Sequence, residues 1–433
     1  MNSDFSMTRR SFVKTGTLVA GATSAFPAIL PSSAKGANER IQLASIGVGG
    51  KGRHGMEFFL KMDDVDLVAV CDVYEPSLEQ ARAMTDNKAE AYRDFREILA
   101  REDIDAVHIS TPDHWHAIPT ILACEAGKDV YVEKPLSLTV AEGGRMVEAA
   151  RRNGRVVQCG TQQRSGTHFQ KAVELVAGGA IGEVTMVKTW TVGNETPDGI
   201  GYPADEPAPA NLDWDFWLGP SPAHAYNRNR HLHFRWFWDH SGGRVTDWGV
   251  HLMDIVHWAM GVDAPLNVSA TGGKYAIKDN RETPDTVHVT WEYPGFLATY
   301  TDRVCNGHPE DGDTYGIQFH GTDGTLYLNR AGWSINPETS GGKSRIPAQS
   351  SAGSEQNCPH ERQFIDCVRS RETPISDIGI THRSTSTCLI ANIALKTGQR
   401  LDWDPVAEKF KGNDEANKLL DYPYRGPWDR VRT

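Results

Sequence analysis

The sequence predicts an α/β protein with two domains: a doubly wound parallel sheet, then an α+β domain with a large, mainly antiparallel open sheet. Three observations support this fold class. Apolar runs alternate with helical stretches from residue 38 to about residue 160, as in parallel sheets with crossover helices. The first run leads directly into a glycine-rich turn. Alternating apolar residues between 286 and 328 indicate antiparallel strands.

Length and composition narrow the class of protein. A chain of 433 residues is longer than the chains that usually fold around a single hydrophobic core, so two domains are expected. Its apolar content of 39% and charged content of 23% are typical of a globular protein. The formal net charge of −11 argues against a nucleic-acid partner. The cysteines lack CxxC spacing, which indicates neither a zinc site nor a disulfide scaffold.

Residues 1–37 resemble a twin-arginine export signal. Arg9 and Arg10 precede Phe12, and a weakly apolar run over residues 15–30 follows. The run is too short and too rich in small and hydroxyl residues for a permanent membrane span. We therefore expect export to the periplasm, with a disordered basic tail as the alternative.

A dinucleotide fingerprint follows the first predicted strand, residues 41–46 (IQLASI). Glycines in a GxGxxG turn allow a pyrophosphate to approach the backbone, and the amides of the next helix favour its charge. The next strand, 65–71, ends at an aspartate that can accept hydrogen bonds from the ribose hydroxyls. The predicted cofactor contacts here are Gly47, Gly49, Gly50, Lys51, Gly52 and Asp72. Asp72 favours NAD, although Lys51 and Arg53 leave NADP open.

The alternation of helices and strands then continues. The predicted helices span 77–85, 95–101, 114–126 and 140–152, and the predicted strands span 106–109, 130–132 and 156–159. Ligands of such sheets bind beyond the carboxyl ends of the strands. The loops there contribute Thr111, Pro112, Asp113, His116, Glu133 and Lys134 to the predicted cofactor crevice. Helix capping or packing is the alternative role for His114 and His116.

The stretch GGRVTDWGVHLMDIVHW, residues 242–258, predicts a single helix that carries the catalytic pair. Asp247 and His251 are four residues apart, so they share one face of that helix. An imidazole can remove the proton of an alcohol near neutral pH, and a carboxylate one turn away can orient it. An ordinary surface pair is the alternative.

Four motifs together resemble the glucose-fructose oxidoreductase, inositol dehydrogenase and rhizopine catabolism (Gfo/Idh/MocA) family. They are the glycine fingerprint, TPDHWHA (111–117), GKDVYVEKPL (127–136) and the 242–258 stretch. The resemblance implies a Rossmann domain over 38–160 and a substrate-binding and oligomerisation domain over 161–433. It also implies that Lys134 reaches nicotinamide and substrate, often before a cis proline, with Asp247 and His251 completing the site. Members commonly pair their sheets face to face, which implies a homo-oligomer, a dimer or tetramer.

The segment GTQQR, residues 160–164, corresponds to the point where the chain of family members leaves the nucleotide domain. This correspondence implies that Gln162 and Arg164 contact the cofactor. A helix is predicted over 168–177, with strands over 184–192, 286–292, 296–303, 315–320 and 326–328, and helices over 360–371 and 381–397. Residues 193–241 form a long irregular segment, which predicts a lid or binding element.

Seven of the twelve tryptophans lie between Trp190 and Trp258, and as a set they favour a carbohydrate site. Core packing is the alternative for any single one of them. The predicted substrate contacts are Lys134, Arg164, His231, Arg235, Trp236, Asp247 and His251. The clustered histidines include no HExxH or facial-triad spacing, so no metal is expected.

These observations predict an oxidoreductase that transfers hydride between a sugar, glycoside or polyol and a tightly bound nicotinamide cofactor. A periplasmic enzyme has little access to free dinucleotide, so the cofactor should be regenerated in place. Three alternatives remain: a redox-neutral glycosidase or lyase that works by transient oxidation and elimination, a non-catalytic dinucleotide sensor, and a metal-dependent lyase.

Overall fold

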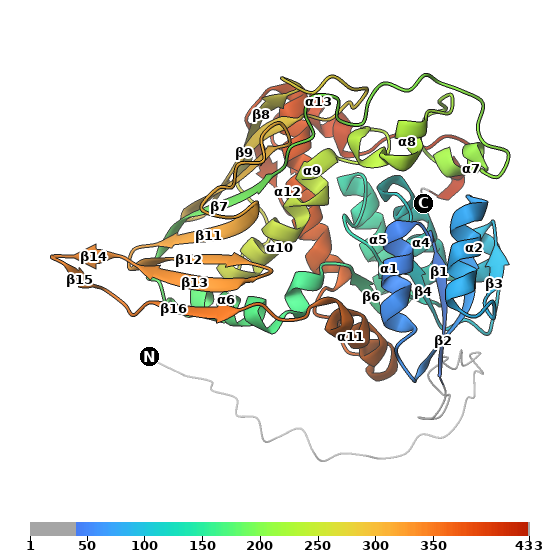
Figure 1. The fold of residues 1–433 in the computed structure, drawn as a ribbon, viewed down its shortest axis with the longest axis horizontal. Coiled ribbons are helices and arrows are strands. Elements are labelled where there is room, and N and C mark those ends of the chain that lie inside the picture. The colour runs from blue at the N-terminus through green and yellow to red at the C-terminus, as the bar shows by residue number, and fades with distance from the viewer. Residues whose placement is uncertain (1–39, 432–433) are drawn as a thin grey trace, which may run out of the picture. The chain divides into compact units, whose positions relative to one another are not determined.

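A six-stranded parallel sheet forms the first half of the computed structural model, which describes residues 40–431 (Figure 1). Its strands are β1 (Ile41–Ile46), β2 (Val65–Cys71), β3 (Glu90–Tyr92), β4 (Ala106–Ile109), β5 (Asp129–Val132) and β6 (Val157–Cys159). The strand order is β3-β2-β1-β4-β5-β6, and every pairing is parallel. The doubly wound order is confirmed. The export signal predicted for residues 1–37 lies outside the described residues.

Helices cover this sheet, and two of its inner strands are buried along their whole length. All residues of β4 and β5 are buried, as expected for strands with helices on both faces. The helices of this half are α1 (Gly50–Phe59), α2 (Glu75–Met84), α3 (Phe95–Leu99), α4 (Ala117–Glu125) and α5 (Val140–Arg152). A capping box between Thr139 and Glu142 starts α5.

The second half is built on a ten-stranded sheet of order β16-β13-β12-β11-β7-β10-β9-β8-β17-β18. Its strands are β7 (Val184–Val192), β8 (Asn267–Gly273), β9 (Thr286–Tyr293), β10 (Phe296–Arg303), β11 (Tyr315–Gly321), β12 (Gly324–Asn329), β13 (Gly332–Pro337), β16 (Gln349–Ala352), β17 (Leu401–Asp404) and β18 (Lys409–Phe410). Within this sheet, among the described residues, only β7 and β10 pair in parallel, so the predicted, mainly antiparallel sheet is confirmed.

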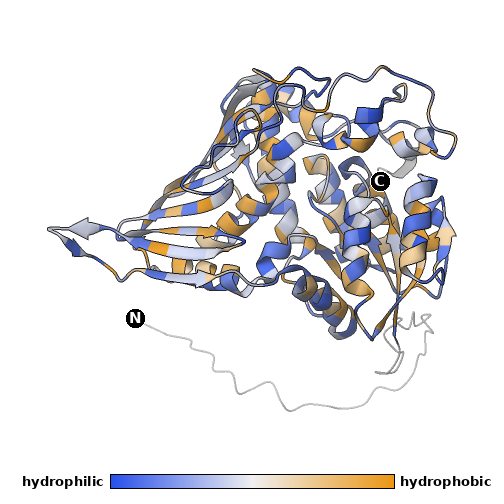
Figure 2. Ribbon diagram, viewed as in Figure 1, coloured by the Kyte–Doolittle hydropathy of each residue, from blue (hydrophilic) through white to orange (hydrophobic). Residues whose placement is uncertain are grey.

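One face of the large sheet packs against helices. Figure 1 shows α6 (Thr167–Ala177), α10 (Gly249–Met260) and α12 (Ile378–Thr397) along that face. Alternate residues of β9, from Val287 to Tyr293, point into this core and are buried. Figure 2 shows the corresponding alternation of hydrophobic and hydrophilic residues along the strands. This alternation fixes which face of the sheet receives the helices.

The remaining elements belong to neither of the two large sheets. They are α7 (Trp214–Leu218), α8 (Arg228–Leu232), α9 (Gly243–Asp247), α11 (Asn357–Ser370), α13 (Asp414–Asn417) and the hairpin of β14 (Thr339–Ser340) and β15 (Lys343–Ser344). The late chain returns to the first sheet, where Cys159 N donates to Ser376 O at 2.9 Å. Within residues 40–431 no helix combines the length and apolarity that crossing a membrane requires.

The single helix predicted for residues 242–258 is wrong. Two helices, α9 and α10, meet at Trp248, whose φ of −101° lies outside the regular helical range. The ammonium of Lys134 binds the Asp247 carbonyl at 2.8 Å at this break. The cation thus satisfies an acceptor at the end of α9, and the Asp247 side chain turns toward it.

Candidate active site

The glycine turn after β1 fits the close approach of a dinucleotide. Gly47 has a φ of +79°, and a Cβ there would lie 2.5 Å from Thr111 N. A Cβ on Gly52 would lie 2.0 Å from Gly47 O, so this glycine allows α1 to pack against the turn. A Cβ on Gly49 or Gly50 would meet nothing within 4 Å, which leaves open space before the first amides of α1. This is the cradle that a pyrophosphate requires.

Asp72 is held in place for ribose recognition. Its two carboxylate oxygens accept hydrogen bonds from Val48 N and Tyr74 N, both at 2.9 Å. Burial raises the pKa of Asp72 to about 6, against the opposing effect of these amides. Each oxygen retains a lone pair, so the carboxylate can still accept from two ribose hydroxyls.

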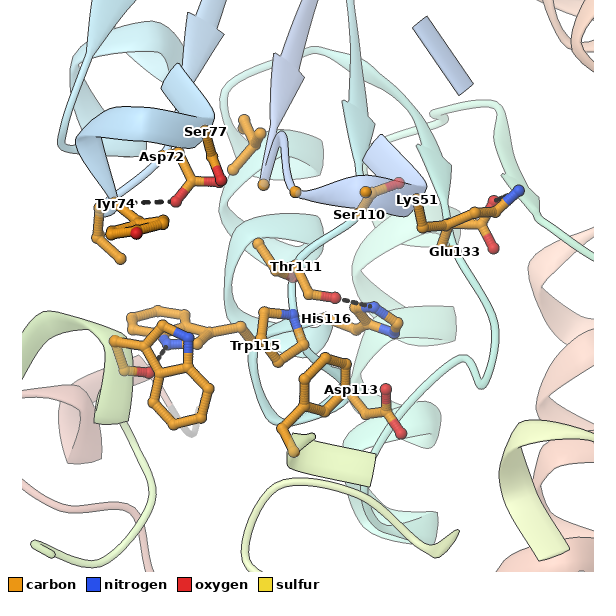
Figure 3. A pocket seen from close by; sticks show the side chains of 18 of the residues that line it. Lys51, Asp72, Tyr74, Ser77, Ser110, Thr111, Asp113, Trp115, His116 and Glu133 are labelled. Atoms are coloured by element: carbon orange, nitrogen blue, oxygen red, sulfur yellow. Dashed lines mark hydrogen bonds and ion pairs between the residues drawn. The ribbon is translucent and has the colours of Figure 1, made fainter. Parts of the chain in front are cut away.

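A cavity of about 560 Å³ begins at this turn and extends to the second domain (Figure 3). The following predicted residues line it: Gly47, Gly49, Gly50, Lys51, Asp72, Thr111, Pro112, Asp113, His116, Glu133, Lys134, His231, Arg235 and Asp247. The hydroxyl of Thr111 is buried without a partner among the described side chains, so it is available to a ligand. Loops from both domains therefore meet around one cavity, as the sequence predicted.

Lys134, Asp247 and Arg235 form the charged part of this lining. Lys134 Nζ lies 2.7 Å from Asp247 Oδ1, and Arg235 Nη1 lies 3.0 Å from Asp247 Oδ2. Burial would raise the pKa of Asp247, but the charges of Lys134 and Arg235 hold it well below its ordinary value. The carboxylate stays ionised and fixes the ammonium. The Lys134–Pro135 peptide is cis, as the resemblance implied.

Glu133 forms a second ion pair beside this set. It lies 3.1 Å from Lys51 Nζ, and Gln162 Nε2 donates to it at 3.0 Å. Burial opposes ionisation, yet the charges of Lys51 and Lys134 lower the pKa of Glu133. Gln162 thus lies behind Glu133 and does not line the cavity.

Two further predicted residues are fixed by hydrogen bonds. Ser241 Oγ donates to Asp113 Oδ2 at 2.5 Å, and burial raises the pKa of Asp113. The ring nitrogens of His116 lie 2.6 Å from Pro135 O and 2.9 Å from Thr111 O. His116 therefore connects the two loops that the sequence placed at the crevice.

His251 lies next to the charged set and does not line the cavity. It is 6% exposed, and its Nδ1 has no hydrogen-bond partner among the described residues. Burial, together with the charges of Lys134 and Arg330, lowers the pKa of His251 well below its usual value. The predicted contact in which Asp247 orients His251 is not seen, because Asp247 binds the two cations instead.

The structure places Arg164 outside the cavity, against its predicted role. Its guanidinium forms a buried ion pair with Asp254, with Nε 2.6 Å from Oδ2, and stacks over Trp258. Trp236 is likewise buried, under the guanidinium of Arg281. Both side chains are satisfied by packing partners, so they hold elements together and do not face a ligand.

The tryptophan set is also not a single sugar platform. Among the seven residues from Trp190 to Trp258, only Trp217 lines the cavity. Trp190 is fully buried in β7, where its ring stacks on Tyr327. A tryptophan count along the chain does not distinguish core positions from cavity positions. Within residues 40–431, no group of three or more His, Cys, Asp or Glu is arranged to hold a metal ion.

Several lining residues were not predicted. They include Tyr74, Ser77, Arg93, Phe95, Phe216, Trp217, Leu232, Phe234 and Ser241. Most are aromatic or apolar, and no short motif marks them. The one available signal was the length and aromatic content of segment 193–241, which predicted a lid without indicating which residues face inward.

Two family models match the chain. Residues 41–161 match the "Oxidoreductase family, NAD-binding Rossmann fold", and residues 190–430 match the "Oxidoreductase family, C-terminal alpha/beta domain". The chain belongs to the Gfo/Idh/MocA oxidoreductase family. Residues 41–161 are thus an NAD-binding Rossmann domain, and the cofactor prediction is confirmed. This Gfo/Idh/MocA chain presents Lys134, Asp247 and Arg235 in the same cavity as its fingerprint.

Curated relatives match over part of the chain. A "Glycosyl hydrolase family 109 protein 1" from Shewanella sp. (strain MR-4) is 34% identical over 154 residues, which is 34% of this chain and 34% of the relative. A "Glycosyl hydrolase family 109 protein" from Shewanella putrefaciens is 33% identical over 152 residues, 33% of either chain. The chain therefore spans about a third of the length of the curated relatives it matches.

Solved structures share the fold over most of the chain. The WlbA dehydrogenase from Bordetella pertussis, in complex with NADH and UDP-GlcNAcA, superposes with a TM-score of 0.64 at 19% identity, covering 84% of this chain and 99% of that one. The aldose-aldose oxidoreductase from Caulobacter crescentus, complexed with glycerol, gives 0.63 at 19% identity, covering 84% and 100%. These identities support the fold alone.

Replacing Asp72 with alanine should weaken NAD binding and relax discrimination against NADP. Two charge-assisted hydrogen bonds to ribose would be lost, each about 1.5–3 kcal/mol. In the wild type, NAD binding should weaken as pH falls through about 6, because protonation of Asp72 removes acceptor capacity. Fluorescence titration with NADH and NADPH measures both effects. Glu75→Ala, a nearby exposed carboxylate outside the cavity lining, is the control, and unchanged NADH affinity of Asp72→Ala would contradict the ribose assignment.

Proposed function

We propose that this chain oxidises a hydroxyl-bearing carbon of a sugar, glycoside or polyol in an NAD-dependent reaction. The observation that carries the proposal is the ion-pair set of Lys134, Asp247 and Arg235 in the lining of the NAD-binding cavity. A fixed positive charge stabilises an alkoxide, the charge that develops when a hydroxyl loses its proton. When bound, NAD supplies the hydride acceptor.

Lys134, Asp247 and His251 have different proposed roles in the removal of the substrate proton. Asp247 holds the Lys134 ammonium through its carboxylate and its backbone carbonyl, at 2.7 and 2.8 Å. Lys134 stabilises the oxygen of the substrate as its proton leaves. We assign that proton to His251, whose pKa is lowered by burial and which is therefore neutral at pH 7; because its ring does not line the cavity in this structure, the assignment requires the ring or the substrate to move into contact. Loss of the proton favours departure of hydride from the same carbon.

The proposal that the substrate is a sugar is based on the proteins whose structures resemble this chain. The Bordetella structure contains UDP-GlcNAcA, and the Caulobacter protein is an aldose-aldose oxidoreductase. The test is to incubate the purified protein with a panel of sugars, glycosides and polyols and to analyse products and bound nucleotide by mass spectrometry. Products smaller than their substrate by two hydrogen atoms support the proposal. A panel without any turnover, although the protein contains NAD, argues against this substrate class.

A second candidate is redox-neutral glycoside cleavage, favoured by the similarity to glycosyl hydrolase family 109 proteins. In this reaction, oxidation of one sugar carbon acidifies the C–H of its neighbour, loss of that proton expels the glycosidic oxygen as an alcohol, water adds to the resulting double bond, and the hydride then returns to the oxidised carbon. The stoichiometry separates the two candidates. Glycoside cleaved without net NADH favours the hydrolase, and accumulation of a keto sugar favours the dehydrogenase.

We also propose that the protein is exported through the twin-arginine route, on the basis of the Arg9-Arg10 pair and the apolar run after it. Changing both arginines to lysine should retain the protein in the cytoplasm, because the export machinery reads the arginine pair and not its charge. Fractionation of cells producing each form measures this. Normal periplasmic accumulation of the double lysine variant would refute the proposal.

A further inference from the structure

A segment of the second domain, residues 211–213, bonds to the loop after Asp72, which lines the nucleotide cavity. Tyr74 and Leu212 form an antiparallel bridge. Beside it, Glu75 N donates to Asn211 O at 3.0 Å, and Asp213 N donates to Val73 O at 3.1 Å. The chain leading into α7 is therefore fastened beside the carboxylate assigned to ribose.

Helix α7 contributes part of the cavity wall. Phe216 and Trp217 line the cavity together with Phe95 and Trp115 of the nucleotide domain. The Trp217 carbonyl accepts hydrogen bonds from Trp115 Nε1 at 2.8 Å and from His114 Nε2 at 3.0 Å. Figure 3 shows Trp115 at this side of the cavity. The wall thus consists of aromatic rings from both domains, joined by two hydrogen bonds to one carbonyl.

The C-terminal segment supports this wall from behind and does not line the cavity. The Trp428 ring stacks on Phe216, with centroids 5.5 Å apart, and meets the edge of Trp115 at 4.8 Å. Arg425 Nη2 donates to Asp215 O at 2.8 Å, and its Nε donates to Gly219 O at 3.1 Å. These two residues hold α7 by its outer side and by its C-terminal end.

The same segment is anchored to the nucleotide domain. Tyr424 OH donates to Glu142 Oε1 at 2.7 Å, and Arg145 on α5 pairs with Asp421 at 3.1 Å. Arg96 lies over the Trp428 ring at 5.2 Å. Residues 421–428 therefore bridge from α5 to the outer face of α7, and α7 cannot lift from the cavity without breaking these contacts.

We propose that residues 421–428 form a C-terminal clamp that keeps α7 closed over bound NAD through turnover, with Trp428 and Arg425 as positioning residues. A dinucleotide released only after the clamp opens dissociates slowly. The inference rests on the proposed function for its consequence: the hydride that leaves the sugar carbon must later be delivered to a carbonyl carbon bound in the same cavity, while a proton is added to the oxygen of that carbonyl. That carbonyl belongs to the same sugar in a redox-neutral cycle or to a second carbonyl substrate.

The test is the dissociation rate of NAD from the full-length protein, measured by chasing bound labelled NAD with excess unlabelled NAD. Trp428→Ala and Arg425→Ala should release NAD at least about tenfold faster than the wild type, because interface changes act mainly on dissociation. Trp428→Phe, which keeps a stacking ring, should remain close to the wild type. Trp333→Ala is the matched control, because Trp333 in β13 has the same 7% exposure and does not line the cavity.

Wild-type NAD release within seconds, or wild-type rates in both Trp428→Ala and Arg425→Ala, would overturn the clamp. Arg425→Ala removes polar contacts and little packed volume, so it stays informative even where Trp428→Ala does not fold. Equal acceleration by Trp333→Ala would also overturn it, since general loosening would then explain the effect. The assay contains no substrate, so its outcome is independent of whether sugars are oxidised.

Discussion

Replacing Lys134 with methionine should lower the rate of NAD reduction by about 10²–10⁴-fold, which makes it one of the two largest effects expected for this chain. Methionine keeps most of the length of lysine and removes the ammonium that Asp247 holds at 2.7 Å. Without that charge, the substrate alkoxide forms in a cavity with no fixed cation at this position. Single-turnover reduction of bound NAD by substrate measures the chemical step without product release.

Arg235→Met is the matched control for this result. Arg235 binds the same carboxylate at 3.0 Å, but its side chain is 47% exposed where that of Lys134 is 14% exposed. Solvent screens an exposed charge, so the loss of rate should be much smaller. Equal losses of rate in the two variants would mean that the reaction depends on the total positive charge around Asp247 and not on the position of the Lys134 ammonium. A wild-type rate in Lys134→Met would remove Lys134 from the chemistry.

Asp247→Asn tests whether the reaction needs the negative charge of this carboxylate or only its shape, which positions the Lys134 ammonium. The amide keeps the shape of the side chain, while the ion pairs to Lys134 and Arg235 lose their charge. The rate should therefore fall more than substrate affinity. This variant also tests the correction to the sequence prediction, because in the structure Asp247 acts on Lys134 and not on His251.

Most of the nucleotide half could be predicted from the sequence, although the short strand β3 (Glu90–Tyr92) was not. The run IQLASI is buried as β1, and the glycine turn and Asp72 follow it at the positions that the fingerprint requires. Such motifs are local: a glycine with positive φ and an acid at the end of the next strand are set by neighbouring residues in the chain. The loop with Lys134 was equally predictable, since it must lie at the carboxyl edge of the same sheet.

The rest depended on contacts between distant residues. Helical spacing predicted one helix through Asp247 and His251, but Lys134, far away in the chain, binds the Asp247 carbonyl where that helix breaks. Arg164 lies where the chain leaves the nucleotide domain, but its guanidinium forms a buried ion pair with Asp254 on α10. The stacking of Trp428 on Phe216 of α7 joins segments that no periodicity relates. In each case, contacts with residues distant in the sequence determined where the side chain or segment lies.

The second of the largest effects is expected at His251. His251→Ala should lower single-turnover reduction of NAD by about 10²–10⁴-fold, because the substrate proton loses its acceptor. NAD binding should stay intact, since the proposed base acts on the substrate proton and not on the dinucleotide. His257→Ala on the same helix is the control. That ring bonds Tyr293 OH at 2.7 Å, so its loss should lower the free energy of unfolding and leave the chemical step unchanged.

The pH dependence gives an independent test of the same residue. Burial, then the charges of Lys134 and Arg330, depress the pKa of His251 well below its usual value of about 6.5. The neutral, proton-accepting form therefore persists as pH falls through 6.5, and the wild-type rate at saturating NAD should decline only in more acid solution. A rate that halves near pH 6.5 would indicate a solvated base. If His251→Ala reduces NAD at the wild-type rate, the proton leaves through Lys134, and the double variant with Lys134→Met should then be no slower than Lys134→Met alone.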